Sequence, residues 1–361
     1  MAQGVWGLEV RAMDTSAGTE THPLDNGELS QAHVVREKNQ PVVGRFAPTP
    51  SGRMHLGNVF SALMAWLSVR NSNGRMVLRI EDLDPRARSR LVANLLMDDL
   101  AWLGLDWDEG PYFQSERGDF YAAAIERLRG QGLTYPCFCT RSELHAATAP
   151  HASDGTYVYR GTCRNLSPKE IAEKARHRPP ATRVRVPDAD DPAGTISFTD
   201  MVYGSCTEIL ARECGDFLVR RSDDVVAYQL AVVVDDALMG VTQVVRGHDL
   251  LGSAPRQIYL QQRLGFASPS YAHVPLLIDP DGRRLSKRDH DLDLGVIRER
   301  GYAPHKVIGY LASLVGLAEK GEGISASELV SRFSWEAIRE HRADIVMEHG
   351  VPPPFAETSC Q

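Results

Sequence analysis

The sequence predicts an α/β protein whose core is a parallel β-sheet. A short apolar run at residues 42–46 is followed by a tight loop and then by an apolar helical pattern over residues 59–70. A second short apolar run at residues 76–80 completes a strand–helix–strand unit. Strands joined in this way run parallel, with a right-handed crossover. Ligands of such sheets bind beyond the carboxyl ends of the strands, so we expect the loop after the first strand and Glu81 to share one crevice.

The rest of the chain continues this mixture of helices and strands. Residues 89–104 are a predicted helix that begins near Ser89, and its residues expected to face the core are Leu91, Leu95, Leu96 and Leu103. Residues 104–111 are interpreted as a turn. Further helices are predicted at residues 115–129, 254–264, 294–300, 304–315, 325–331 and 334–342. Strands are predicted at residues 181–186, 195–200, 217–220, 241–246 and 273–278, and residues 225–236 are expected to begin as a strand and continue as a buried helix.

Changes in composition suggest how the 361 residues are organised. Residues 1–40 are polar and aperiodic, which is typical of a disordered extension. After residue 134 the periodicity fades, and Cys, His, Pro and Thr become frequent, which indicates an insertion. The predicted regions are a disordered extension (1–40), a main α/β domain (41–134 and 205–290), the insertion (135–204), a helical C-terminal region (291–345) and a loose tail (346–361).

Composition narrows the functional classes. With 43% hydrophobic residues the chain can bury a large core, and no apolar run approaches the ~18 residues of a membrane span. Residues 1–30 contain no apolar signal-peptide core, so the protein is expected in the cytoplasm. Six cysteines in a chain of this length do not suggest a disulfide framework. The net charge of −7 argues only weakly against a nucleic-acid partner, because a local basic face can bind RNA.

The loop between the first strand and helix has the composition of an anion-binding site. Its residues are Arg45-Phe46-Ala47-Pro48-Thr49-Pro50-Ser51-Gly52-Arg53-Met54-His55-Leu56-Gly57-Asn58. Prolines and glycines fix the turn, and the unpaired amides at the start of the helix can hold a phosphate or carboxylate. The loop matches neither a Walker loop nor a G-x-G-x-x-G turn. Taken alone, it could also be an ordinary strand–helix connection.

A second basic segment decides between these interpretations. It reads Asp281-Gly282-Arg283-Arg284-Leu285-Ser286-Lys287-Arg288. Together, His55-Leu56-Gly57-Asn58 and Arg284-Leu285-Ser286-Lys287-Arg288 resemble the HIGH and KMSKS signatures of class I aminoacyl-tRNA synthetases. The surrounding residues, from about 42 to 317, resemble the glutamyl branch and above all the short glutamyl-Q tRNA(Asp) synthetases. This resemblance implies a Rossmann-like catalytic domain, a zinc-containing insertion and a small helical C-terminal region.

The resemblance implies that the protein activates L-glutamate with ATP. The glutamate carboxylate would attack the α-phosphorus, and pyrophosphate would leave, which requires positioning and charge neutralisation more than a covalent nucleophile. His55 can donate to phosphate oxygens and Lys287 can neutralise the developing pyrophosphate, so both are candidate catalytic residues. Mg²⁺ is expected to accompany ATP. The candidate ATP-binding residues are Pro48, His55, Gly57, Asn58, Arg284, Leu285, Ser286, Lys287 and Arg288.

Binding the side-chain carboxylate of a glutamate substrate requires a cation, and a guanidinium group can form two parallel hydrogen bonds with a carboxylate. Arg45 and Arg246 are candidates because both belong to predicted core strands, where an unpaired guanidinium is costly. Alternatively, they form structural pairs with Glu81 or Asp249. Tyr228 can bind the substrate or simply belong to the core. The family pattern implies that the glutamate-binding residues are Arg45, Phe46, Ala47, Pro48, Thr49, Glu81, Tyr228 and Arg246.

The insertion contains a candidate zinc site. Cys137, Cys139 and Cys163 could provide three thiolates of a closed tetrahedral site. Chemistry alone leaves the fourth ligand open among His145, His151, Tyr157 and Tyr159, and three reduced thiols without metal are the alternative. The resemblance favours a structural Zn²⁺ held by Cys137, Cys139, Tyr159 and Cys163.

The resemblance also implies the acceptor, which would be the queuosine in the anticodon of tRNA(Asp), with glutamate activated before tRNA binds. Residues 289–361 are too few for the long helical anticodon-binding region of full-length glutamyl enzymes. Three other functions remain open: a truncated glutamyl-tRNA synthetase charging tRNA(Glu), an inactive RNA-binding paralogue, and a glutamate-activating ligase with a non-RNA acceptor. We expect a monomer with no membrane partner.

Overall fold

The structure is a computed structural model that describes residues 41–140, 142–143, 158–283, 285 and 293–347, and the structural statements below refer to these residues. The strands are β1 (Val43–Phe46), β2 (Arg75–Ile80), β3 (Glu109–Phe113), β4 (Thr134–Cys137), β5 (Ala181–Val184), β6 (Thr195–Asp200), β7 (Gly204–Ile209), β8 (Phe217–Arg220), β9 (Gln243–Gly247), β10 (Ser270–Val274), β11 (Leu277–Ile278) and β12 (Ile345–Val346). The α-helices are α2 (Leu56–Asn71), α3 (Arg90–Trp102), α4 (Gly118–Gly130), α6 (Pro168–Ala175), α7 (Leu210–Glu213), α8 (Tyr228–Leu238), α9 (Ala254–Leu264), α10 (Leu294–Glu299), α11 (Pro304–Ser313), α12 (Ala326–Leu329) and α13 (Trp335–Glu340). The 3₁₀ helices are η1 (Pro85–Ala87), η2 (Gln114–Glu116), η3 (Pro192–Gly194), η4 (His248–Ser253) and η6 (Val330–Arg332).

The first unit of the fold is the predicted strand–helix–strand motif. β1 and β2 pair in parallel, with Val43 opposite Arg75 and Phe46 opposite Leu78, and α2 connects them. α2 begins at Leu56, three residues earlier than expected, because the extended backbone of His55 caps it and the His55 carbonyl accepts the first helical hydrogen bonds. The prediction of a parallel sheet is confirmed.

Two sets of strands form the central layer. One sheet has the order β1-β2-β3 and the other β7-β6-β10-β9, in which only β7 pairs antiparallel. β9 lies beside β1, and the Thr242 amide donates to the Val43 carbonyl over 2.9 Å. Alternate residues of β1 and β2 enter two hydrophobic cores, one on the α2 side and one on the side of α4, α8 and α9. A sheet buried on both faces explains why its strands read as short continuous apolar runs.

Several local predictions need correction. β3 begins inside the predicted turn at residues 104–111 and continues to Phe113. Gly110 and Pro111 hid the pattern, and a proline fits there because β3 is an edge strand. Residues 225–227 are not a strand, and α8 begins at Tyr228. The predicted strand at 273–278 is divided into β10 and β11 around Pro275.

The predicted inward face of α3 is wrong at Leu91, whose surface is 72% exposed. The buried stripe of this helix runs through Ala93, Leu96 and Leu100. Leu91 precedes Ala93 by two residues, which is a rotation of about 200° around the helix axis, so it lies on the opposite side.

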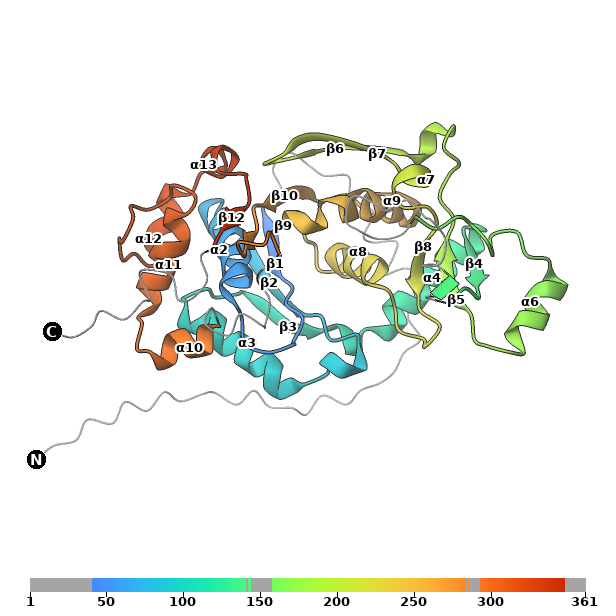
Figure 1. The fold of residues 1–361 in the computed structure, drawn as a ribbon, viewed down its shortest axis with the longest axis horizontal. Coiled ribbons are helices and arrows are strands. Elements are labelled where there is room, and N and C mark those ends of the chain that lie inside the picture. The colour runs from blue at the N-terminus through green and yellow to red at the C-terminus, as the bar shows by residue number, and fades with distance from the viewer. Residues whose placement is uncertain (1–40, 141, 144–157, 284, 286–292, 348–361) are drawn as a thin grey trace, which may run out of the picture.

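A smaller antiparallel sheet, β4-β5-β8, and helix α6 lie at one end of the elongated molecule, while α10 to α13 lie at the other end (Figure 1). Strand pairing crosses the predicted boundary at residues 204 and 205. β6 pairs with β10 of the central layer, whereas β8 pairs with β5 of the small sheet. The predicted extension 1–40 and most of the predicted tail fall outside the described residues. None of the helices described here is long and apolar enough to cross a membrane.

Candidate active site

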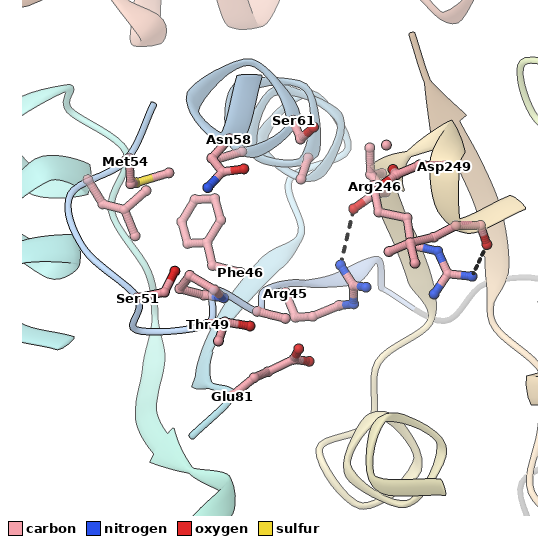
Figure 2. A pocket seen from close by; sticks show the side chains of 18 of the residues that line it. Arg45, Phe46, Thr49, Ser51, Met54, Asn58, Ser61, Glu81, Arg246 and Asp249 are labelled. Atoms are coloured by element: carbon pink, nitrogen blue, oxygen red, sulfur yellow. Dashed lines mark hydrogen bonds between the residues drawn. The ribbon is translucent and has the colours of Figure 1, made fainter. Parts of the chain in front are cut away.

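A cavity of about 470 Å³ opens where the carboxyl ends of β1, β2 and β9 meet the start of α2 (Figure 2). This is the crevice expected from the topology of the sheet. Every predicted glutamate-binding residue lines it, namely Arg45, Phe46, Ala47, Pro48, Thr49, Glu81, Tyr228 and Arg246. His55 and Asn58 line it as well. The fold therefore brings these side chains to one cavity, although they are up to 201 residues apart in the chain, as the sequence analysis predicted.

Arg45 extends from β1 into this space. Its guanidinium is buried, donates to the Val245 carbonyl over 3.1 Å and lies 3.7 Å from the Asp236 carboxylate. Burial lowers the pKa of Arg45, the negative charge of Asp236 opposes that shift, and the nearby positive charge of Arg246 adds to it. Two guanidinium groups facing one buried cavity favour an anionic ligand between them.

Arg246 comes from β9 and is held at several points. Its Nε donates to His273 over 3.0 Å, its Nη1 to Gln257 over 2.9 Å and its Nη2 to the Leu250 carbonyl over 3.1 Å. The Tyr228 hydroxyl lies 3.5 Å from Nη1.

Glu81 follows β2 and is one of the two acidic residues that line the cavity, the other being Asp249. Its carboxylate accepts from Arg79 over 3.2 Å, and Figure 2 shows it on the same side of the cavity as Arg45. Burial raises the pKa of Glu81, while the positive charges of Arg79 and Arg45 oppose this shift. A carboxylate at this place can accept hydrogen bonds from an ammonium group.

Behind Glu81 lies a buried charge network that sequence reasoning missed. Arg79 is fully buried, donates to Asp236 over 2.6 Å and lies 3.7 Å from Asp235. Asp235 in turn accepts from Arg117 over 2.7 Å. The sequence did contain a sign of this network, because Asp235 and Asp236 lie in the apolar run that forms α8. Charged residues rarely lie in a core unless they are paired.

The loop that carries His55 is tied to the segment that follows the basic loop. His55 forms an isolated bridge with Asp293, and the Leu294 amide donates to the Met54 carbonyl over 2.9 Å. Leu285, the described residue in the middle of the basic motif, is buried and donates from its amide to Leu277. The predicted ATP-binding residues Arg284, Ser286, Lys287 and Arg288 lie outside the described residues. Gly57 does not line the cavity, but a side chain there would lie 3.3 Å from the His55 ring.

A second connection between these segments runs through Asp99, which sequence reasoning also missed. Its carboxylate is fully buried and accepts from Arg53 over 2.5 Å, from the Met54 amide over 3.2 Å and from Arg298 over 3.1 Å. Arg298 belongs to α10, so Asp99 connects the loop before α2 with the helix that follows the basic segment. The signal was an acidic residue at a core position of the predicted helix 89–104, three residues after Leu96.

The predicted zinc ligands converge in the insertion. The sulfur atoms of Cys137, Cys139 and Cys163 all lie within 4.8 Å of one another, and Tyr159 Oη lies 3.5 Å from Cys137 Sγ and 3.6 Å from Cys139 Sγ. Ligand atoms around a tetrahedral zinc with bonds of about 2.3 Å are separated by roughly 3.8 Å, so these groups fit one ion. The other candidate ligands, His145, His151 and Tyr157, fall outside the described residues.

Comparisons with known proteins show the family to which the chain belongs. The family described as "tRNA synthetases class I (E and Q), catalytic domain" matches residues 41–349. The chain is 50% identical over 303 residues to the glutamyl-Q tRNA(Asp) synthetase of Symbiobacterium thermophilum, covering 80% of this chain and 91% of that protein. It is 39% identical over 350 residues to glutamate–tRNA ligase 1 of Halorhodospira halophila, covering 87% of this chain and 72% of that protein. A crystal structure of a glutamate tRNA ligase from Elizabethkingia meningosepticum in complex with its amino acid superposes with a TM-score of 0.71 at 27% identity, over 86% of this chain and 68% of that one.

Proposed function

Because this chain belongs to the class I tRNA synthetases of the glutamate and glutamine type, and is therefore a ligase, we propose that it is a glutamyl-Q tRNA(Asp) synthetase. It would activate L-glutamate with ATP without tRNA, and then transfer the glutamate to the queuosine base in the anticodon of tRNA(Asp). Its reaction would follow two steps at one site.

The observation that carries the first step is the pair of buried guanidinium groups in the cavity. Arg45 and Arg246 can receive the side-chain carboxylate of glutamate, because both line the cavity and both are held by neighbouring groups. Glu81 lies beside them and can accept from the substrate's α-ammonium group. With both ends of glutamate held, its α-carboxylate is free to react.

In that step, an oxygen of the α-carboxylate bonds to the α-phosphorus of ATP, and the bond to pyrophosphate breaks. We propose that His55 and the first amides of α2 hold phosphate oxygens, since α2 begins at the cavity. Lys287 would neutralise the leaving pyrophosphate. Mg²⁺ would be bound mainly by the phosphates.

In the second step, a hydroxyl of the queuosine ring attacks the activated carbonyl, an ester bond forms and AMP leaves. Support for this acceptor comes from the greater similarity to glutamyl-Q tRNA(Asp) synthetases than to glutamate–tRNA ligases. A structural Zn²⁺ held by Cys137, Cys139, Tyr159 and Cys163 would crosslink the insertion beside the central sheet.

The test uses labelled glutamate, ATP and two tRNA pools, one from cells that make queuosine and one from cells that cannot. We expect label only with the first pool, in the anticodon fragment of tRNA(Asp). Label on acceptor ends in both pools would identify a glutamate–tRNA ligase instead. Label on neither pool, with glutamate-dependent pyrophosphate exchange intact, would indicate a non-RNA acceptor.

A pair of variants tests the ATP step alone. Lys287→Ala should lower glutamate-dependent exchange of pyrophosphate into ATP on the order of 10²-fold, because the positive charge that neutralises the leaving pyrophosphate is lost. Lys306→Ala is the control, since Lys306 is an exposed residue of α11 outside the cavity. Equal exchange rates in the two variants would refute the assigned role. No exchange by the parent protein would indicate an inactive paralogue.

A further inference from the structure

The orientation of Arg246 depends on a neighbour that does not line the cavity. His273 lies directly opposite Arg246 in the parallel pairing of β10 with β9, and its side chain is fully buried. Its Nε2 lies 3.0 Å from Arg246 Nε. Since arginine can only donate, His273 Nε2 must be the acceptor and cannot carry a proton.

Asp200, at the end of β6, fixes the tautomer that this contact requires. Its Oδ2 lies 2.7 Å from His273 Nδ1, so the ring proton is on Nδ1 and the lone pair is on Nε2. Asp200 itself is held in place, because its Oδ1 accepts from the amides of Val202 and Tyr203 over 2.9 and 3.0 Å. Burial lowers the pKa of His273 to about 4, so the ring is neutral at pH 7.

The contact with His273 determines which N–H groups of Arg246 can bind a ligand. An arginine has five, and the contacts to His273, Gln257 and the Leu250 carbonyl use one each on Nε, Nη1 and Nη2. Nη2 therefore keeps one N–H for a ligand, and the second N–H of Nη1 makes only the 3.5 Å contact to the Tyr228 hydroxyl, which a bound carboxylate can replace. With Nε occupied, the guanidinium cannot turn its Nε edge toward the cavity.

We propose that Asp200 and His273 form a positioning device that holds the Arg246 guanidinium in one orientation and thereby sets the preference for a carboxylate over a carboxamide. This inference rests on the proposed function. A carboxylate can accept from both fixed N–H groups, whereas a carboxamide offers a single oxygen and places its own N–H₂ against a donor. A guanidinium free to rotate could meet the carboxamide oxygen with one N–H and avoid that conflict.

Two variants of matched chemistry separate the roles of the ring nitrogens. In His273→Gln the amide oxygen can reach the position of Nε2 and accept from Arg246. In His273→Asn the shorter amide lies near the position of Nδ1, so it can contact Asp200 but not Arg246. Both variants carry an amide in place of the ring, so they test the contact to Arg246 and not merely the presence of a ring.

The readouts are kcat and KM for glutamate, glutamine and ATP in pyrophosphate exchange. We expect His273→Asn to raise KM for glutamate and to lower the glutamate-over-glutamine ratio of kcat/KM on the order of 10²-fold, with KM for ATP unchanged. His273→Gln should keep that ratio within a few-fold of the parent. A loss confined to kcat and equal for all substrates would mean a purely structural role and would overturn the inference, as would equal ratios in the two variants.

Asp200→Asn provides a second test if His273→Asn does not fold. The amides of Val202 and Tyr203 hold the Asn carbonyl at the Oδ1 position, against one amide, that of His273, at Oδ2. The Asn N–H₂ therefore faces His273 Nδ1 and moves the ring proton to Nε2, against Arg246. The glutamate-over-glutamine ratio should again fall, and an unchanged ratio would contradict the inference. Glutamate-dependent pyrophosphate exchange by the parent protein is measured first. If the parent shows no exchange, the proposed function and this inference are both overturned. If the parent shows exchange but the variants keep its selectivity, the inference alone is overturned.

Discussion

Replacing Arg79 by leucine would remove the central cation from a buried network of three carboxylates. Arg79 is fully buried, and its guanidinium contacts Asp236 at 2.6 Å, Glu81 at 3.2 Å and Asp235 at 3.7 Å. Each of these carboxylates is itself largely withdrawn from water, so the lost charge cannot be replaced by solvent.

The size of the effect follows from the charges that remain. Arg45 is 3.7 Å from Asp236 and Arg117 is 2.7 Å from Asp235, so two cations would face three carboxylates. One buried negative charge is then uncompensated. Breaking a buried ion pair from one side costs about 3–5 kcal/mol in the free energy of unfolding, against a total of about 5–15 kcal/mol for a typical domain.

The assay is denaturant unfolding followed by circular dichroism, with Arg75→Leu as the control. Arg75 lies at the other end of the same strand, where it pairs with Glu109, and its side chain is 46% exposed. The control should lose less than about 1 kcal/mol, because exposed ion pairs contribute little. Losses of similar size in the two variants would refute the reasoning.

The same variant should also acquire a characteristic pH dependence. Burial raises the pKa of Glu81 above its ordinary value of 4.5, and Arg79 opposes that rise. Without Arg79 the pKa of Glu81 in the folded state should rise further. A group with a raised folded-state pKa contributes stability at low pH that is lost as the pH rises through that pKa, so Arg79→Leu should lose more stability than the parent as the pH rises above 4.5.

Three further predictions concern the other parts of the site. Elemental analysis should find about one zinc per chain in the parent protein. Cys163→Ser should lose this zinc, whereas Cys214→Ser, at a buried cysteine outside the cluster, should keep it. A parent protein without zinc would contradict the proposed site. Asp99→Asn should lower kcat for pyrophosphate exchange about tenfold with little change in KM for glutamate, because the link between the His55 loop and Arg298 weakens. An unchanged kcat would contradict this role. Because the pKa of His273 is lowered from 6.5 to about 4, the neutral ring should contribute up to about 3 kcal/mol to the free energy of unfolding above pH 6.5. This stability should be lost as the pH falls toward 4, and unfolding curves should show the loss in the parent and not in His273→Gln.

The sequence was most informative where local pattern and chemistry coincide. The run from Arg45 to Asn58 combines a buried strand, turn residues and a helix start, and all three appear in the structure, with the helix beginning three residues earlier than expected. The position of Glu81 at the same cavity could be predicted because parallel strands place their carboxyl ends together. Tyr228 and Arg246 were assigned from the family pattern, and the structure places both at the cavity.

Elements on the edges of sheets were harder to predict. β7 has the polar sequence Gly-Ser-Cys-Thr-Glu-Ile, and it forms a strand because it pairs along its whole length with β6. Such pairing depends on a neighbour and leaves little apolar periodicity in the strand itself. The same holds for β3, whose Pro111 is tolerated only because one side of the strand is unpaired.

Supporting residues of the site were missed for a different reason. Asp99, Asp200 and His273 are fixed by partners 46, 73 and 27 residues away, and no local pattern connects them with those partners. Each is buried and therefore needs a polar partner, which its own sequence neighbourhood does not identify. The sequence thus predicts the groups that face the cavity better than the groups that orient them.

Helix α2 has consequences for how the protein could be dissected. It is buried over almost its whole surface, since it packs against β1 and β9 on one side and against α11, α12 and η6 on another. Asn71, at its end, donates to the Val330 carbonyl over 2.8 Å. A fragment ending before α10 would leave an apolar stripe of α2 open to water, directly behind the residues that begin the cavity. The C-terminal helices therefore cannot be exchanged between relatives as an independent module unless the outward face of α2 is exchanged with them.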